Sequence, residues 1–202
     1  MRRLMIITAS LGVAVAIASA TAFSAPSIAP GAPDRTPTKT PSSLAAKLAL
    51  ARLGTAKYAT DLKRAKADCY RIITRIIPNM GYHYLNPNVK GFDVRKPAIL
   101  VYVRRGTAWQ LNALEWVFTE KPAKPPLKGA RYGSFGAACH YVDGTFVFAD
   151  AETECASTSP ETGTAFGFWH PPLITLHVWL WYPNPTGVFA DTNPLVAAFN
   201  RG

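Results

Sequence analysis

The segment PAILVYVRRGTAWQLNALEWVFT, residues 97–119, decides the fold class of this chain. Two runs rich in β-branched and aromatic residues, Pro97–Arg104 and Ala108–Thr119, flank the tripeptide RGT at 105–107. Such runs are typical of strands, and a short glycine-containing connection between them predicts a β-hairpin. The chain is therefore expected to contain an antiparallel sheet.

Further strands are predicted downstream of this hairpin. Phe135–Tyr141 and Thr145–Ala149 flank the turn dipeptide Asp143-Gly144. Leu173–Tyr182, which reads LITLHVWLWY, has the strongest strand pattern in the chain. The proline-rich residues after it are expected to be irregular.

Upstream of the hairpin, residues 44–77 show a helical period. Apolar or small residues recur at steps of three and four, which is typical of one stripe on an amphipathic helix. The stripe comprises Leu48, Ala51, Thr55, Tyr58, Leu62, Ala65, Cys69, Ile72 and Ile76. Ser42 or Ser43 can cap the start, and Pro78 ends the pattern. We expect one long helix, with a bend near Gly54 or two abutting helices as the alternative.

The predicted fold class is α+β, with the long N-terminal amphipathic helix packed on a small antiparallel sheet or partial barrel. Residues 44–202 suit a single globular domain. Residues 23–43 are rich in Pro, Ala, Ser and Thr and are predicted to be a disordered linker.

Residues 1–22 have the features of a signal peptide. Two arginines precede an uncharged apolar run, and Ala18 and Ala20 provide small residues at the spacing that signal peptidase requires. The run is too short for a comfortable membrane span. The sequence therefore predicts a secreted, extracytoplasmic protein without a transmembrane anchor after processing.

The formal net charge of +10 is unevenly distributed. Residues 44–77 carry eight basic side chains against two acidic ones, whereas the chain from Pro78 onward is nearly neutral. The basic residues are Lys47, Arg52, Lys57, Lys63, Arg64, Lys66, Arg71 and Arg75. Outside the cell such a segment favours an anionic envelope component as partner, with a merely solvated helix face as the alternative. No pattern typical of nucleic-acid binding accompanies the charge.

Three cysteines are an odd number for an oxidising compartment. Cys139 and Cys155 flank a polar stretch and are predicted to form a disulfide. Cys69 lies on the helical stripe, where a buried free thiol is expected. Pairing of Cys69 with either of the others stays open, since sequence does not fix connectivity.

Two ionisable residues are predicted on apolar strand faces, because alternate residues of a strand share a face. One face carries Trp109, Leu111, Ala113, Glu115 and Val117, and another carries Leu173, Thr175, His177, Trp179 and Trp181. A charged group in such surroundings has to be paired or ligated. We therefore expect Glu115 and His177 to face one cavity.

His83 and His170 are further candidates for that cavity. Two or three histidines with one glutamate form a ligand set typical of zinc and other divalent-metal sites with an open position. The expected apolar walls are Tyr82, Tyr84, Trp116, Trp179 and Trp181. A structural Glu115–His177 hydrogen bond, and a small-molecule site without metal, are the alternatives. His140 is interpreted as a surface loop residue. No HExxH or GxSxG motif assigns a reaction.

Five segments of the chain form a recognisable set of motifs: TAKYATDLKRAKADCY (55–70), MGYHYLNP (80–87), PAILVYV (97–103), LEWVF (114–118) and LHVWLWYPNPTGVFADTNPLV (176–196). Together they resemble a family of uncharacterised secreted bacterial proteins. The resemblance covers most of residues 51–200 and implies that His83, Glu115 and His177 recur as polar positions. Cys69 departs from the family pattern, where glycine is expected. The resemblance implies a site but no established activity.

Overall fold

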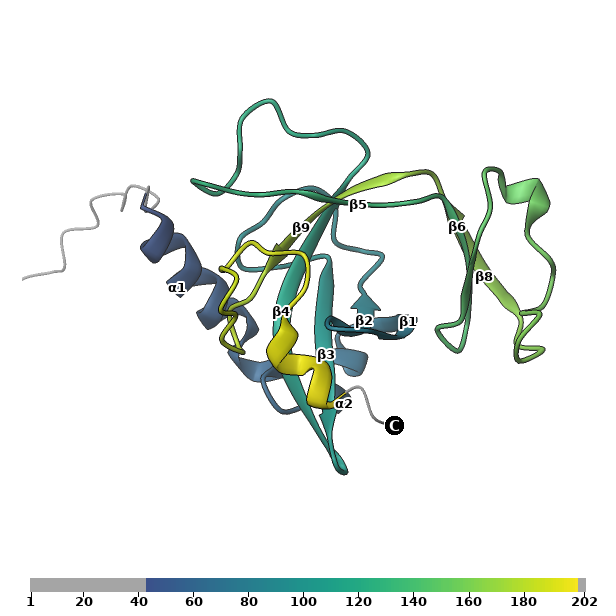
Figure 1. Cartoon of the computed structure of the whole chain (residues 1–202), viewed down its shortest axis with the longest axis horizontal. Helices are drawn as coiled ribbons and strands as arrows, with labels where there is room; N and C mark the ends of the chain where they lie inside the picture. Colours follow the sequence, from purple (N-terminus) through teal and green to yellow (C-terminus); the bar gives the residue numbers. More distant parts are fainter. Residues whose placement is uncertain (1–42, 200–202) are drawn as a thin grey trace, which may run out of the picture. The chain divides into compact units, whose positions relative to one another are not determined.

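The computed structural model describes residues 43–199, which form an α+β fold with a curled antiparallel sheet (Figure 1). In chain order the elements are α1 (Leu44–Thr55), η1 (Ala56–Tyr58), α2 (Leu62–Ala67), β1 (Arg71–Ile77), β2 (Gly81–Leu85), β3 (Ile99–Arg105), β4 (Ala108–Phe118), β5 (Gly133–Phe135), β6 (Ala138–Tyr141), β7 (Phe146–Phe148), η2 (Glu152–Glu154), β8 (Phe166–His170), β9 (Leu173–Val178) and η3 (Pro194–Phe199). The main sheet has six strands in the order β1-β2-β3-β4-β9-β5, and a second sheet has the order β7-β6-β8. The signal peptide predicted at 1–22 lies outside the described residues, as does the predicted linker apart from Ser43.

The predicted hairpin at residues 97–119 is confirmed as β3 and β4. The two strands pair in antiparallel register from Ile99 opposite Glu115 to Arg105 opposite Ala108. Gly106 in the turn has a φ of 60°, a left-handed conformation that glycine adopts without steric penalty. The hairpin therefore forms the centre of the main sheet, with β2 on one side and β9 on the other.

A β-bulge at Asn112 interrupts this hairpin. Val101 lies opposite Ala113, whereas the next residue, Tyr102, lies opposite Leu111, so Asn112 is an extra residue in β4. Its side-chain amide donates to the carbonyl oxygen of Met80 at 2.8 Å. Because side chains alternate between faces, one inserted residue reverses the face of everything before it. The predicted common face from Trp109 to Val117 is therefore wrong in its first half.

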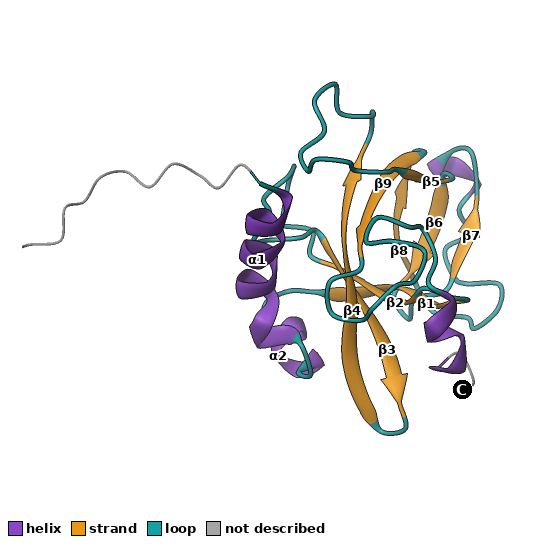
Figure 2. Ribbon diagram, turned by 60° about the vertical axis from the view of Figure 1, so that its left-hand side comes forward, coloured by secondary structure: helices purple, strands orange, loops and turns teal. Residues whose placement is uncertain are grey.

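The main sheet has a different apolar core on each of its faces. The first core packs strand residues such as Leu100, Leu114 and Leu176 against α1, η1 and α2, through Ala51, Tyr58, Leu62 and Ala65. The second lies on the opposite face and includes Ile99, Val101, Ala113 and Val196 of η3. Figure 2 shows α1 and α2 on one side of the strands and η3 on the other. The face on which a strand side chain lies therefore decides which of the two cores it can join.

The single long helix predicted over residues 44–77 is replaced by three shorter elements and a strand. α1 ends at Thr55, whose side-chain hydroxyl donates to the carbonyl oxygen of Ala51 at 2.7 Å. After η1, Asp61 caps α2 by accepting from the backbone N–H of Arg64. The alternative of abutting helices is therefore the better description of the first part of the stripe.

The prediction of helix for the last part of the stripe is wrong, because β1 occupies residues 71–77. This segment reads RIITRII, and its β-branched residues favour a strand, which pairs with β2. Ile72 and Ile76 continue the spacing of three and four by coincidence. The Ala51, Tyr58, Leu62 and Ala65 positions of the stripe do contact the sheet as expected.

Cys69 terminates α2 in a left-handed conformation with a φ of 72°. The N–H of Tyr70 donates to the carbonyl oxygen of Ala65, and the N–H of Cys69 to that of Lys66. These two bonds form a Schellman motif, in which glycine is the preferred residue at the left-handed position. The thiol of Cys69 is free and exposed, so the expectation of a buried thiol is wrong.

The predicted disulfide is confirmed between Cys139 and Cys155. It joins β6 to the segment that follows η2, and β6 and β7 form the hairpin predicted around Asp143-Gly144. A disulfide fits an extracytoplasmic protein. Within residues 43–199, no helix is long and apolar enough to cross a membrane.

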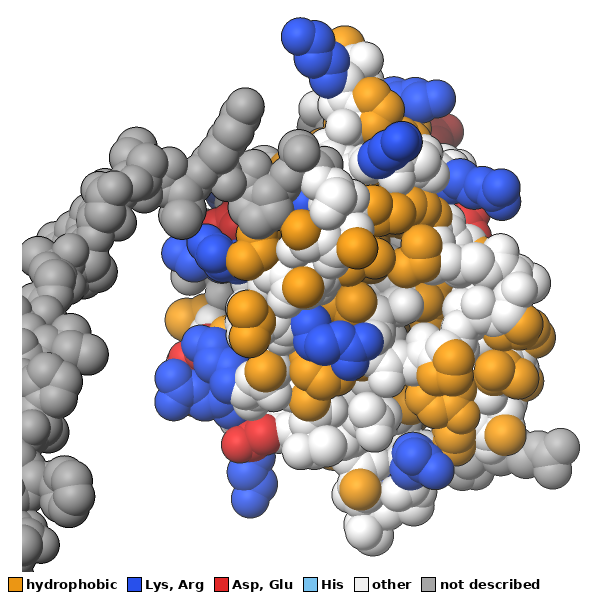
Figure 3. All heavy atoms as spheres, turned by 90° about the vertical axis from the view of Figure 1, so that its left-hand side faces the viewer, with side chains coloured by type: hydrophobic (Ala, Val, Ile, Leu, Met, Phe, Trp, Pro, Cys, Tyr) orange, Lys and Arg blue, Asp and Glu red, His pale blue; other side chains and the backbone are white. Residues whose placement is uncertain are grey.

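The basic residues of 44–77 are spread over α1, η1, α2 and β1 rather than over one helix face. Arg52 donates to the carbonyl oxygen of Leu180 and lies over the ring of Trp181. Lys57 and Arg64 pair with Asp68. Figure 3 shows the Lys and Arg side chains of the face seen there, separated by apolar and uncharged ones. Much of the predicted basic segment therefore makes contacts within the protein.

Candidate metal centre

Three neighbouring strand registers bring His83, Glu115 and His177 together. Glu115 of β4 lies directly opposite His177 of β9. His83 of β2 lies opposite Val101 of β3, which in turn lies opposite Ala113, two residues before Glu115. Residues two apart in a strand share a face. All three side chains therefore lie on the sheet face opposite the helices.

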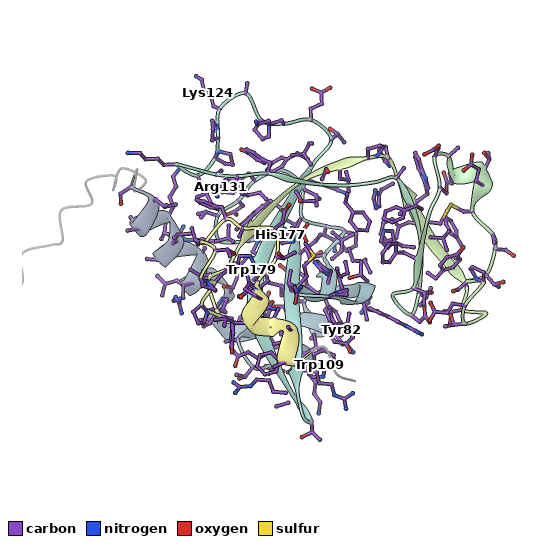
Figure 4. All side chains as sticks on the ribbon, viewed as in Figure 1. Tyr82, Trp109, Lys124, Arg131, His177 and Trp179 are labelled. Atoms are coloured by element: carbon purple, nitrogen blue, oxygen red, sulfur yellow. A yellow bond between two sulfur atoms is a disulfide. The ribbon has the colours of Figure 1, made fainter. Side chains whose placement is uncertain are left out.

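The three side chains are buried, each with an exposed fraction of 4%. His83 Nε2 lies 3.7 Å from Glu115 Oε2, and His177 Nε2 lies 3.5 Å from the same oxygen. One potential ligand atom from each residue falls within 4.8 Å of the other two. Figure 4 shows His177 in the interior of the molecule, with Tyr82 and Trp109 toward the hairpin end of the sheet.

Each imidazole ring has an oxygen near its other nitrogen, and for His83 this contact is a hydrogen bond. His83 Nδ1 lies 2.8 Å from the hydroxyl of Thr74, and His177 Nδ1 lies 3.7 Å from Asp191 Oδ1. Histidine ligands of metals characteristically engage their second ring nitrogen with an oxygen in this way, which fixes the ring orientation. The two Nε2 atoms are thereby directed at Glu115.

Three polar atoms of the centre lack hydrogen-bond partners among the described residues. Glu115 Oε2, His177 Nδ1 and His177 Nε2 are buried atoms without a partner. Their separations of 3.5–3.7 Å exceed the usual hydrogen-bond range of about 2.7–3.2 Å. Two donors bound tetrahedrally to one zinc ion at about 2.0–2.1 Å lie roughly 3.3–3.4 Å apart. The two separations from Glu115, 3.7 Å to His83 and 3.5 Å to His177, are closer to the spacing of ligands on one ion than to the length of a hydrogen bond.

The electrostatic surroundings shift the pKa values of the two histidines in opposite directions. Burial lowers the pKa of His83 to about 4, so this ring is neutral near pH 7. Burial also opposes a charge on His177, but Glu115 and Asp191 outweigh it and raise the pKa of His177 to about 9. The same His177 charge lowers the pKa of Glu115 against the effect of burial. Without a bound ion, the centre is an imidazolium–carboxylate pair beside a neutral imidazole.

A cavity of about 970 Å³ lies in front of these three residues. Aliphatic and aromatic side chains from both sheets line it, among them Leu85, Ile99, Val117, Phe168 and Leu173. His83, Glu115, His177 and Asp191 supply polar groups in the same lining. The arrangement is typical of small-molecule sites, which combine apolar walls with a few convergent polar groups.

His170 lies in the lining of this cavity but apart from the group of three. It belongs to β8, and its Nε2 lies 3.0 Å from Nε2 of His140. His140 is 2% exposed and its Nδ1 lies 2.7 Å from the carbonyl oxygen of Ile73, so its interpretation as a surface loop residue is wrong. The structure therefore places His170 with a second histidine and not with Glu115.

None of the five aromatic residues predicted as cavity walls lines the cavity. Tyr82, Tyr84 and Trp116 each neighbour a residue of the centre in sequence, so they point to the helix-covered face. Trp179 donates through Nε1 to the carbonyl oxygen of Ala190. Trp181, beyond the end of β9, donates to the hydroxyl of Thr55.

Thr74 and Asp191 are site residues that the sequence analysis missed. Thr74 lies in the segment interpreted as helix, so its position opposite His83 in a strand pair was not predicted. Asp191 lies in the proline-rich tail, within the last motif of the resemblance. Gly133 of β5 lets Asp191 approach, because a Cβ there would overlap the Asp191 carboxylate. The motif around Asp191 was the only available signal for either residue.

Comparison of the chain with protein-family models, curated proteins and solved structures finds no match. The resemblance to secreted bacterial proteins accordingly stays a prediction.

Proposed function

We propose that this protein binds a divalent transition-metal ion of the zinc type through His83, Glu115 and His177. The observation that carries the proposal is the convergence of three buried donor atoms within 4.8 Å, at separations too long for hydrogen bonds. A buried carboxylate and imidazole without partners are unfavourable unless a ligand satisfies them. A metal ion would satisfy all three at once.

The donor set leaves room for a further ligand. Two imidazoles and one carboxylate are found in hydrolytic zinc centres and in non-haem iron centres, both of which keep open coordination positions. A bound ion would supply Lewis acidity to a small molecule held in the cavity. Thr74 and Asp191 would keep both rings oriented, and the apolar walls would exclude water. The proposed role is therefore metal-dependent binding or catalysis.

Binding of the ion competes with a proton. His177 Nε2 needs its lone pair to act as a ligand, yet the pKa of His177 is raised to about 9. The imidazolium must therefore lose a proton when the ion binds below that pH. Asp191 beside Nδ1 would compensate by making the neutral ring a better donor.

Elemental analysis tests the proposal directly. The purified protein, loaded with Zn²⁺ and desalted, is compared with His83→Gln, Glu115→Gln and His177→Gln. We expect about one equivalent of zinc in the unmodified protein and a large loss in each variant. His170→Gln is the matched control, because it removes an imidazole from the same cavity wall but not from the group of three. Equal substoichiometric zinc in all five proteins would contradict the proposal.

Export from the cytoplasm is part of the proposed function. The Cys139–Cys155 disulfide and the features of residues 1–22 support it. Fractionation of cells that express the full chain tests export. We expect a processed product outside the cytoplasm, and accumulation of the unprocessed chain inside after both N-terminal arginines are replaced by glutamate.

A further inference from the structure

The cavity carries a cationic rim away from its metal centre. Lys66 at the end of α2, Arg71 at the start of β1 and Lys90 in the β2–β3 connection all line it and are exposed. Pairing of Arg71 with Leu85, and the bond from Asn86 to the carbonyl oxygen of Asp68, bring these segments together. Three cations from three separate segments thus border the cavity, and Lys66 Nζ lies 5.9 Å from the centre of the Tyr84 ring.

These cations are not neutralised locally. Within residues 43–199, Lys66, Arg71 and Lys90 form no ion pair, and the nearby Asp68 is engaged by Lys57 and Arg64. The only acidic residues in the cavity lining are Glu115 and Asp191, which both belong to the metal centre. The rim therefore presents positive charge to whatever enters.

The rim and the metal centre lie a short distance apart along β2. Leu85, opposite Arg71, is two residues from His83, which corresponds to roughly 7 Å along a strand. Aliphatic side chains such as Leu85 and Ile99 share the lining between them. A molecule that bridges the two places must expose an apolar body to these walls and a negative charge to the rim.

We propose that the cavity binds an anionic amphiphile, a molecule with a hydrocarbon chain and a carboxylate or phosphate head group. The head group lies at Lys66, Arg71 and Lys90, and the chain extends between the apolar walls toward His83, Glu115 and His177. This inference deepens the proposed function by naming the class of molecule that reaches the metal centre, and it rests on that function only for what happens there. A neutral apolar molecule would leave the rim unused, and a cationic one would be repelled.

Displacement of a fluorescent anionic probe tests the inference, with ligands kept below their micelle concentrations. We expect decanoate to displace the probe at about tenfold lower concentration than decanol, and decyltrimethylammonium not to displace it. Replacing Lys66, Arg71 and Lys90 by glutamine should weaken decanoate binding about tenfold and leave decanol binding unchanged, since three exposed ion pairs are lost. Higher salt should weaken decanoate binding in the unmodified protein only.

The matched control replaces Lys63, Lys124 and Lys128 by glutamine, which removes the same charge outside this cavity. Equal weakening of decanoate in this control, or equal affinity for decanoate and decanol, would overturn the inference. So would loss of the preference for decanoate in Glu115→Gln rather than in the rim variant, because the head group would then lie at the metal centre. Decyl phosphate against decanoate distinguishes a phosphorylated lipid from a free fatty acid as the source of the head group.

Zinc content separates this inference from the proposed function. The rim variant should keep its zinc, and Glu115→Gln should keep its preference for decanoate. Decanoate binding without any zinc binding would contradict the proposed metal centre and support the amphiphile site. Zinc binding without decanoate binding would support the metal centre and contradict the amphiphile site.

Discussion

At the scale of single residues, Cys69 occupies a backbone position that suits glycine better. Its φ of 72° completes the Schellman motif at the end of α2. A side chain in this conformation brings Cβ close to the following carbonyl oxygen, a steric penalty of roughly 1–2 kcal/mol. The glycine that the resemblance implies before Tyr70 would therefore suit this backbone position for a local physical reason, and the thiol itself is exposed.

Cys69→Gly is expected to raise the free energy of unfolding by about 1 kcal/mol, because relief of the steric penalty outweighs the greater freedom of glycine in the unfolded chain. Urea unfolding of the two proteins measures the difference. Cys69→Ala is the control, since it removes the thiol and keeps Cβ. An equal gain in the alanine variant would assign the effect to the thiol instead of the backbone.

Gly133 has an equally local role at the metal centre. A Cβ at this position would overlap the carboxylate of Asp191, which in turn faces His177 Nδ1. Gly133→Ala is therefore expected to displace Asp191 and weaken zinc binding about 10- to 100-fold, with all three ligands intact. Asp191→Asn should weaken zinc binding to a similar degree. Competition with a chelating dye measures both affinities. Gly136→Ala serves as control, because the added Cβ would meet only the exposed ring of Phe148.

At the scale of elements, strand periodicity predicted the centre but failed for the part of β4 before Asn112. Alternation correctly placed Glu115 with Val117, and Thr175 with His177, because β4 after Asn112 and β9 are regular. It misplaced Trp109 and Leu111, because the extra residue at Asn112 reverses the alternation of faces before it. No composition rule marks an asparagine in a strand as a bulge, so this part required the structure.

The helical segment shows the opposite error. Spacing of three and four identified the residues of α1, η1 and α2 that pack on the sheet, but it also continued through β1, which has the same spacing in RIITRII. Burial by long-range pairing with β2, and not local periodicity, makes that segment a strand. The sequence analysis therefore did not identify Thr74 as the partner of His83.

The Asn112 bulge is expected to contribute measurably to stability. Its side-chain N–H donates to the Met80 carbonyl oxygen, and its backbone carbonyl oxygen accepts from the backbone N–H groups of Trp181 and Tyr182. Asn112→Ala removes the first of these bonds from a fully buried position and should lower the free energy of unfolding by about 1–3 kcal/mol. Gln110→Ala, which loses a bond to the neighbouring Leu111 carbonyl oxygen, is the control and should change stability less. Urea unfolding compares the two variants, and a larger loss for Gln110→Ala would contradict this role of the bulge.

At the scale of the whole molecule, the metal centre joins the sheet that carries it to the outlying Asp191 segment. β2, β4 and β9 supply the ligands, and the carboxylate that holds His177 follows β9 in the chain. In the absence of a metal ion, a charged His177 is attracted both to Glu115 of β4 and to Asp191 of this segment. The charge state of one histidine therefore links the stability of the fold to pH.

Because the pKa of His177 is raised to about 9 from its usual 6.5, its contribution to stability is fully present below pH 6.5 and is lost as the pH rises through 9. Chelator-treated protein should therefore show a falling free energy of unfolding over this interval. His83 and His140, whose pKa values burial lowers to about 4, act in a separate window below pH 6.5. Zinc-saturated protein should not show the alkaline decline, since the ion replaces the proton. Urea unfolding of both forms between pH 6 and 9 makes the comparison, with chelator-treated His177→Gln as the control. If that variant declines as steeply as the unmodified protein, the coupling does not reside in His177.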